Sequence, residues 1–109
     1  MSEKPLSFEK KEITEQELIG VLQSGEIGDP ATREAVARWT KQEEKKVGND
    51  PEASIRFNIK RGNVYFLGGY PQEALEVLED ARMQAHQEQR TELYNEIMDM
   101  MDSIEANTT

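Results

Sequence analysis

The sequence predicts an all-α domain of four to five short helices. Apolar residues recur at steps of three and four over most of the chain, as in the series Ile55, Ile59, Gly62 and Phe66, which would form one stripe of a helix. Asp-Pro and Gly-Gly pairs divide the chain at helix-length intervals. No stretch alternates apolar and polar residues over a useful length, and the β-prone run 63–66 stays in phase with the helical stripe.

Length and composition restrict the function classes that need to be considered. A chain of 109 residues forms one domain with a modest core. It has no cysteine, which excludes disulfides, thiolate metal sites and thiol catalysis. A net charge of −9 disfavours nucleic acid and anionic membranes, and no apolar run reaches the length of a membrane span. We therefore expect a soluble cytoplasmic protein.

The first helix is expected after a charged segment, residues 1–12, which is interpreted as a flexible arm. Thr14 and Glu17 have the spacing of a capping box, in which each side chain accepts from the other residue's free backbone N–H. Ile13 and Leu18 flank the box at the spacing of a hydrophobic staple, and Gly25 is the predicted end of the helix.

The second helix is predicted to begin at Asp29-Pro30 and to end at Gly48. Aspartate accepts from the unpaired N–H groups of a helix start, and proline at the first position has no N–H to leave unpaired. The predicted apolar face is thin, with Trp39 as its main anchor, and the run KQEEKK is interpreted as a solvated face. The residues assigned to the apolar face are Ala31, Ala35, Val36, Trp39 and Val47.

The third and fourth helices are predicted to form a hairpin over residues 51–88. Asp50-Pro51 is the start signal, Gly68-Gly69 ends the first arm, and Pro71 begins the second. Phe57, Val64 and Tyr65 are expected to widen the stripe of the first arm. The residues expected to pack the hairpin are Ile59, Gly62, Tyr65, Phe66, Ala74, Leu78 and Ala81.

A fifth helix is predicted over residues 91–105 as a cap on the hairpin, with its acids facing outward and its methionines filling the core. The polar run HQEQR before it is compatible with a break or with a continuous helix. The complete helical domain is expected to span residues 13–106, and residues 107–109 are expected to fray.

Charge is unevenly distributed along the chain. Residues 53–72 carry Arg56, Lys60 and Arg61 and no acid, whereas residues 73–109 carry ten acids and two bases. This basic segment is interpreted either as a ligand-binding face or as the partner of the acidic last helix. Arg56, Lys60 and Asn63 lie at steps of four and three, so they share one face of a helix.

Residues 55–81 resemble a tetratricopeptide repeat, a helix-turn-helix of about 34 residues. Gly62 matches the small residue of its first helix and Gly69 its turn glycine, while Ala74 and Ala81 match the two alanines of its second helix. The most specific part of the match is the phrase GYPQEALEVLEDA. The closing proline of the repeat would fall at His86, and no second repeat is found on either side.

The resemblance implies an antiparallel hairpin whose first helix lines a binding groove. In chaperone-binding members of the family, basic and Asn side chains at places resembling Arg56, Lys60 and Asn63 hold peptide carboxylates. The resemblance therefore implies a protein or peptide partner with acidic groups, bound by a non-catalytic adaptor. The alternative is a structural helical subunit that forms a homodimer or joins a larger complex.

Residues with catalytic chemistry are sparse. His86 is the only histidine and is interpreted as a solvated residue near a helix end. Without a second histidine near Glu88 or Glu92, the chain has no metal-ligand pattern, and its glycines do not have the spacing of a phosphate-binding loop. The sequence therefore predicts no enzyme activity, no metal and no cofactor.

Overall fold

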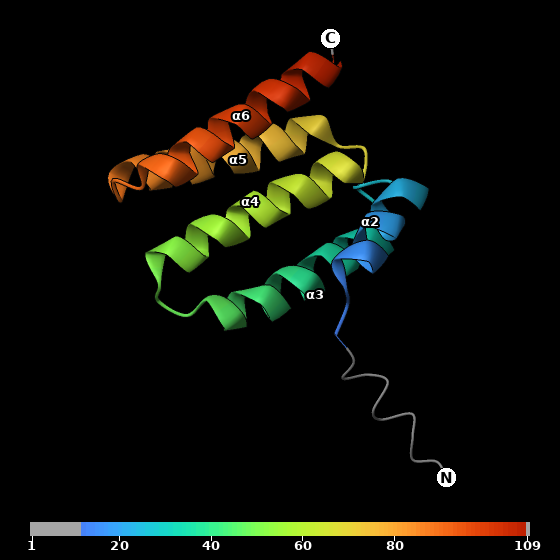
Figure 1. Ribbon diagram of the computed structural model, residues 1–109. Coiled ribbons are helices and arrows are strands. Elements are labelled where there is room, and N and C mark those ends of the chain that lie inside the picture. The colour runs from blue at the N-terminus through green and yellow to red at the C-terminus, as the bar shows by residue number, and fades with distance from the viewer. Residues whose placement is uncertain (1–11, 109) are drawn as a thin grey trace.

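A computed structural model describes residues 12–108 and shows five α-helices, with no strand in that range. The long helices run antiparallel to their neighbours in the sequence, and the short first helix packs at one end of the group (Figure 1). The helices are α2 (Glu15–Ser24), α3 (Pro30–Val47), α4 (Pro51–Leu67), α5 (Pro71–Gln87) and α6 (Thr91–Thr108). The predicted all-α class is confirmed. The expected flexible arm, except for its last residue, lies outside the described residues.

Helix α2 begins as its sequence predicts. The Thr14 hydroxyl accepts from the Glu17 N–H at 3.0 Å, and the Glu17 carboxylate accepts from the Thr14 N–H at 2.9 Å. Ile13 and Leu18 are both buried, which is consistent with the hydrophobic staple. The helix ends where the Gly25 N–H donates to the Val21 carbonyl.

Helix α3 has the predicted bounds, but two details of the prediction are wrong. The Asp29 carboxylate does not cap the helix, because it accepts instead from the Glu26 N–H in the preceding turn, at 3.2 Å. Ala31 is exposed, and Thr32 is the buried residue of this first turn. Trp39 is 2% exposed and stacks at an angle on Phe57, with 5.7 Å between the ring centroids, so it is the predicted anchor of the helix.

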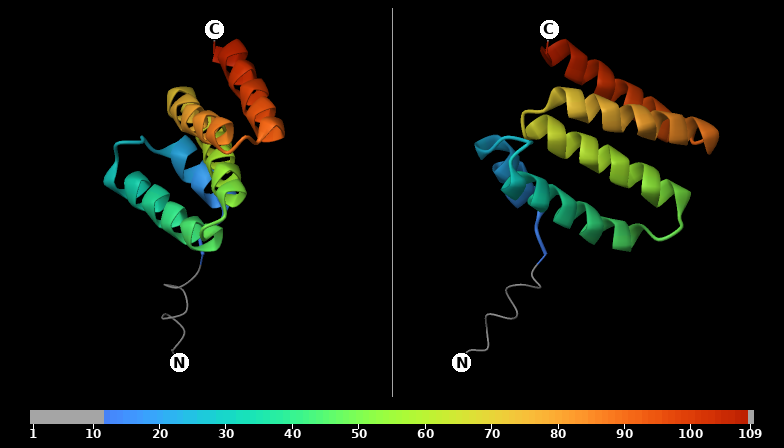
Figure 2. Two further views of the ribbon diagram at one scale, coloured as in Figure 1. Left: turned by 90° about the vertical axis from the view of Figure 1, so that its left-hand side faces the viewer. Right: turned by 180° about the vertical axis from the view of Figure 1, so that it is seen from behind.

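Helix α4 is shared by two separate apolar clusters, which lie on opposite sides of it. The first cluster joins α4 to α5 and α6 through residues such as Ile55, Leu78 and Ile97. The second joins α4 to α2 and α3 through Phe57 and Val64. The expectation that Phe57 and Val64 widen the Ile55 stripe is therefore wrong. Figures 1 and 2 show α4 between the α5–α6 pair and the α2–α3 pair.

The hairpin arms are in close contact because α4 presents a glycine to α5. A Cβ atom added at Gly62 would lie 2.6 Å from Leu78 Cγ, and Leu78 is fully buried. Ala74 and Ala81 are also fully buried, whereas Ile59, Tyr65 and Phe66 are half-buried and pack against the same cluster. These are the residues that the sequence assigns to hairpin packing.

The α4–α5 and α5–α6 turns have the same hydrogen-bond pattern. At the first, the Tyr70 N–H donates to the Tyr65 carbonyl and Gly69 has a φ of +96°. At the second, the Arg90 N–H donates to the Ala85 carbonyl at 2.8 Å, and Gln89 has a φ of +58°. This is the Schellman arrangement, with glutamine in the left-handed position that glycine usually occupies. The HQEQR segment is therefore a break between two helices.

Helix α6 covers α5 with the buried residues Leu93, Ile97 and Ile104, and its acids face outward as expected. It continues to Thr108, so the predicted end at 105 is wrong. The fraying expected for residues 107–109, the last of which lies outside the described residues, stays a prediction. The Asn107 side chain donates to the Ser103 carbonyl at 3.0 Å, which supports the last turn.

Two glycine-to-alanine variants test the close approach of α4 and α5. Gly62→Ala is expected to lower the free energy of unfolding by about 1–3 kcal/mol, because Leu78 is enclosed and has no room to move away from the new methyl group. Gly20→Ala in α2 is the matched control, since a Cβ there meets nothing within 4 Å. It is expected to stabilise the domain by about 0.5–1 kcal/mol. Urea unfolding measures both, and equal effects of the two substitutions would contradict the packing argument.

Candidate functional site

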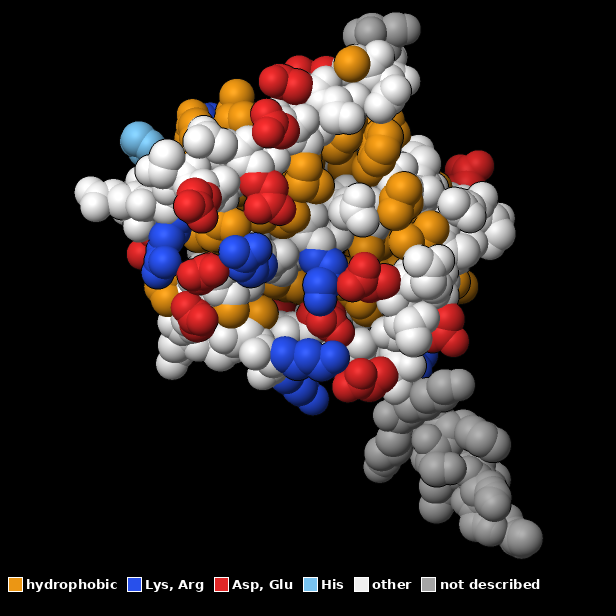
Figure 3. Space-filling view, in the orientation of Figure 1, with side chains coloured by type: hydrophobic (Ala, Val, Ile, Leu, Met, Phe, Trp, Pro, Cys, Tyr) orange, Lys and Arg blue, Asp and Glu red, His pale blue; other side chains and the backbone are white. Residues whose placement is uncertain are grey.

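The three predicted binding residues lie together on α4. The side chains of Arg56 and Lys60 are 57% and 42% exposed, and Asn63 is exposed. Because α4 is held from two sides by apolar clusters, these residues project from a rigid helix. The face of the molecule seen in Figure 3 is a mosaic of basic and acidic side chains with apolar side chains between them.

Arg56 and Lys60 of α4 are paired with acids of α2, α3 and α4 and not with the acids of α6, whereas Arg61 is bonded to a neutral side chain. Arg56 Nε donates to Glu52 Oε2 at 3.1 Å, one turn earlier on the same helix. Arg61 donates to Asn58 at 3.1 Å and lies over the Phe57 ring. Within residues 12–108, the proposal that the acidic last helix neutralises these charges is therefore wrong.

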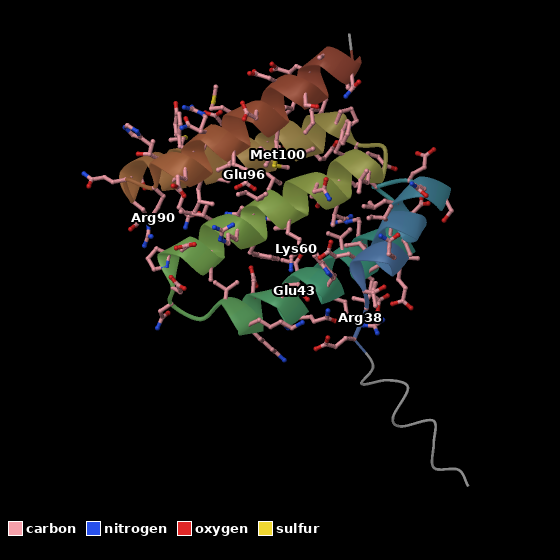
Figure 4. The ribbon with its side chains drawn as sticks, in the orientation of Figure 1. Arg38, Glu43, Lys60, Arg90, Glu96 and Met100 are labelled. Atoms are coloured by element: carbon pink, nitrogen blue, oxygen red, sulfur yellow. The ribbon has the colours of Figure 1, made fainter. Side chains whose placement is uncertain are left out.

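Lys60 belongs to a polar cluster centred on Glu43 of α3. Lys60 Nζ lies 3.5 Å from Glu43 Oε1 and 3.6 Å from a Glu15 carboxylate oxygen of α2. Lys46 Nζ lies 3.1 Å from the other Glu43 oxygen, Oε2. Figure 4 shows Lys60 and Glu43 in the space between α4 and α3. One carboxylate thus connects two lysines from different helices.

Glu43 is only 9% exposed, which makes it the one buried acid in the described part of the chain. Burial by itself raises its pKa, but hydrogen bonds from Gln42 and Lys46 and the charge of Lys60 outweigh burial and hold the pKa below its ordinary value. The same contact with Glu43 raises the pKa of Lys46. Glu43 therefore remains ionised while buried, as a structural anion.

Gln42 extends this cluster to the segment before α2. Its side-chain amide donates to the Ile13 carbonyl and accepts from the Ile13 N–H, both at 2.9 Å. The sequence interpretation missed both residues, because it assigned the whole KQEEKK run to solvent. A signal was present, since Glu43 lies four residues after Trp39 and so shares its helix face.

Metal clusters and membrane-spanning helices were two of the features considered from the sequence. Between Glu12 and Thr108, no group of three or more histidine, aspartate or glutamate side chains is placed to hold a metal ion. In the same range, no helix is long and apolar enough to cross a membrane. His86 is exposed in the last turn of α5, as the sequence predicts, with its ring 6.1 Å from that of Tyr94.

The Glu43 cluster predicts a pH-dependent contribution to stability. Because the folded-state pKa is below the unfolded value, the contribution is complete above the unfolded pKa and is lost as the pH falls through the folded pKa. Glu43→Gln is expected to lower the free energy of unfolding by about 1–2 kcal/mol at neutral pH. The difference from the wild type should shrink below the ordinary glutamate range, near 4.5.

Glu44→Gln is the matched control, since Glu44 is the exposed neighbour of Glu43 on the same helix. Chemical unfolding followed by circular dichroism across this pH range measures both variants. A constant deficit of Glu43→Gln at every pH would show that the ionised form of Glu43 does not stabilise the fold.

No protein-family model matches this chain, and neither a curated protein nor a solved structure matches it. The likeness of residues 55–81 to a tetratricopeptide repeat therefore rests on the residues quoted above. Any function must be argued from the side chains that α4 and its neighbours present.

Proposed function

We propose that this chain is a non-catalytic, cytoplasmic helical adaptor that binds a segment of another protein on the outward face of α4. The observation that carries the proposal is the exposure of Arg56, Lys60 and Asn63 along one face of a helix that is otherwise buried on two sides. Donors fixed on a rigid helix bind an acceptor with little loss of conformational entropy.

The chemistry of these donors suits a carboxylate-bearing segment. Arg56 uses one N–H on Glu52 and keeps its other donors for a ligand. Its existing pair is exposed, and such pairs contribute little to stability, so a partner carboxylate can replace Glu52 at low cost. The resemblance to a tetratricopeptide repeat supports the same face, because the equivalent helix lines the groove in that family.

The three residues are not equally available. Lys60 is engaged by Glu15 and Glu43, so a ligand must compete with two acids for its ammonium group. Arg56 and Asn63 are therefore expected to contribute most of the affinity, with Lys60 providing a more distant charge.

Self-assembly is the alternative function, and one observation favours it. Met83 on α5 is 50% exposed, which makes it the most exposed large apolar side chain in the described range. Methionine adapts to varied partner surfaces, including that of a second copy. Sedimentation at micromolar concentration separates the two functions, because a monomer at that concentration excludes the homodimer.

Variants on the α4 face test the adaptor proposal. Arg56→Glu combined with Asn63→Asp reverses one charge and adds another without touching the Glu43 cluster. Partner recovery in an affinity purification from the native host, quantified by mass spectrometry, is expected to fall at least about tenfold. Loss of a charge-assisted hydrogen bond accounts for a change of this size.

Arg33→Glu is the control, because it reverses the charge of an exposed arginine that belongs to α3 and not to α4. Circular dichroism must show that every variant remains folded. Recovery of the same partners at unchanged levels with the double variant would refute the role of the α4 face.

A further inference from the structure

The corner between α5 and α6 carries a second concentration of hydrogen-bond donors. Two surface hollows of about 480 and 270 Å³ adjoin each other there, and both are lined by Gln89, Arg90 and Thr91. In Figure 4, Arg90 lies at this corner, beside the start of α4. Neither the tetratricopeptide resemblance nor the face formed by Lys60 and Asn63 accounts for it.

The larger hollow is lined by donors and by no acid. The residues that line it lie within 85–95 and include His86, Arg90, Tyr94 and Asn95. A hollow without a carboxylate is unexpected in a chain of net charge −9, in which Asp and Glu outnumber Lys and Arg by 22 to 13. The hollow therefore contains a positive charge and no negative one, although the chain as a whole is negatively charged.

Arg90 is only partly engaged within the protein. Its side chain is 43% exposed, and one N–H donates to Glu52 Oε1 at 3.2 Å. The other Glu52 oxygen accepts from Arg56, so a single carboxylate serves two guanidinium groups. Each arginine has five N–H donors, which leaves several of them for a ligand.

Tyr94 lines the same hollow and carries a hydroxyl group that can donate a hydrogen bond. Its hydroxyl oxygen accepts from Arg82 Nη1 at 3.2 Å, so the hydroxyl proton remains for another acceptor. Arg82 is itself held by Glu79, whose hydrogen bonds together with that to Tyr94 raise the pKa of Arg82. The Tyr94 hydroxyl is thus held by a hydrogen bond from a permanently charged guanidinium group.

The backbone holds Arg90 in place. The Arg90 N–H donates to the Ala85 carbonyl at 2.8 Å, within the Schellman arrangement that ends α5. Gln89, immediately before it, has a φ of +58°. A guanidinium that starts from a fixed backbone loses less conformational freedom when it binds a ligand.

We propose that this corner, centred on Arg90 with Tyr94 and His86, is a binding site for a carboxylate group of an acidic peptide segment. A planar carboxylate accepts two parallel bonds from a guanidinium, and the remaining lone pairs suit the tyrosine hydroxyl and an imidazole N–H. On the side of the smaller hollow, Glu52 and Glu92 oppose an anion, so the ligand is placed in the larger hollow.

The test uses the full chain, amidated hexaglutamate as the probe and hexalysine as the control peptide. Amide chemical shifts in a titration are expected to change saturably at residues 85–95 with hexaglutamate alone. Arg90→Ala is expected to weaken binding at least about fivefold, and Tyr94→Phe to weaken it by a smaller factor. Arg33→Ala, which removes an exposed arginine outside both hollows, should leave the affinity unchanged.

Three results would overturn the proposal. The first is the absence of saturable shifts at residues 85–95 up to millimolar peptide. The second is a loss of affinity in Arg33→Ala equal to that in Arg90→Ala. The third is tighter binding of inorganic phosphate than of acetate at the same amides. Asn63→Asp distinguishes this site from the α4 face, because Asn63 lines neither hollow. If Asn63→Asp abolishes partner recovery while hexaglutamate binding persists, the two sites are independent.

Discussion

The burial of two opposite sides of α4 is the constraint on which the rest of the structure depends. Ile55 on one side and Val64 on the other contact separate apolar clusters, and neither cluster is complete without α4. Burying apolar side chains of this size contributes about 1.5–3 kcal/mol each, so the helix is held more strongly than its own propensity would allow. The faces that remain open on α4 are therefore narrow, and any ligand meets a rigid surface.

Polar contacts determine how the α2–α3 pair is placed on this central helix. Apolar packing is non-directional, so it would tolerate some sliding of α3 along α4. Glu43 limits that sliding, because its two oxygens engage Lys46 and Lys60 while Gln42 holds the backbone of Ile13. A buried ion pair adds little net stability but penalises arrangements that leave its charge unpaired. Lys60 consequently stabilises the position of α3 on α4, in addition to the binding role proposed for it.

Local chemistry made the helices and the packing of α4 against α5 predictable, whereas the polar contacts of α3 with α4 and the second apolar cluster on α4 were not. The capping box at Thr14 and the Pro residues that open α3, α4 and α5 act within a few residues, so their effect follows from the sequence. The burial of Glu43 was missed because alternating charge is typical of a solvated face, and only its spacing from Trp39 indicated otherwise. The role of α4 in two clusters was missed because one periodic stripe was extended to cover all its apolar residues.

The α5–α6 corner was beyond prediction for a different reason. Arg90 and Glu52 are 38 residues apart, and they meet only because α4 and α6 both begin at the same end of the molecule. The sequence interpretation assigned the basic segment to residues 53–72. It described Arg90 only as part of the polar run HQEQR and gave it no role. In the fold, Arg56 of the basic segment and Arg90 of the polar run both donate to the carboxylate of Glu52.

The proposal that this acidic chain binds an acidic segment requires an attraction that acts at short range. The net charge of −9 opposes the approach of an anion, but at physiological salt exposed charges are screened beyond about 8 Å. Within that distance the proposed ligand meets Arg90, Tyr94 and His86 in the larger hollow, while Glu52 and Glu92 lie on the side of the smaller hollow. Direct hydrogen bonds from oriented donors are also less sensitive to screening than long-range attraction. In this proposal, the negative charge elsewhere on the chain disfavours nucleic acid and other extended polyanions, because their charge cannot be confined to one small hollow.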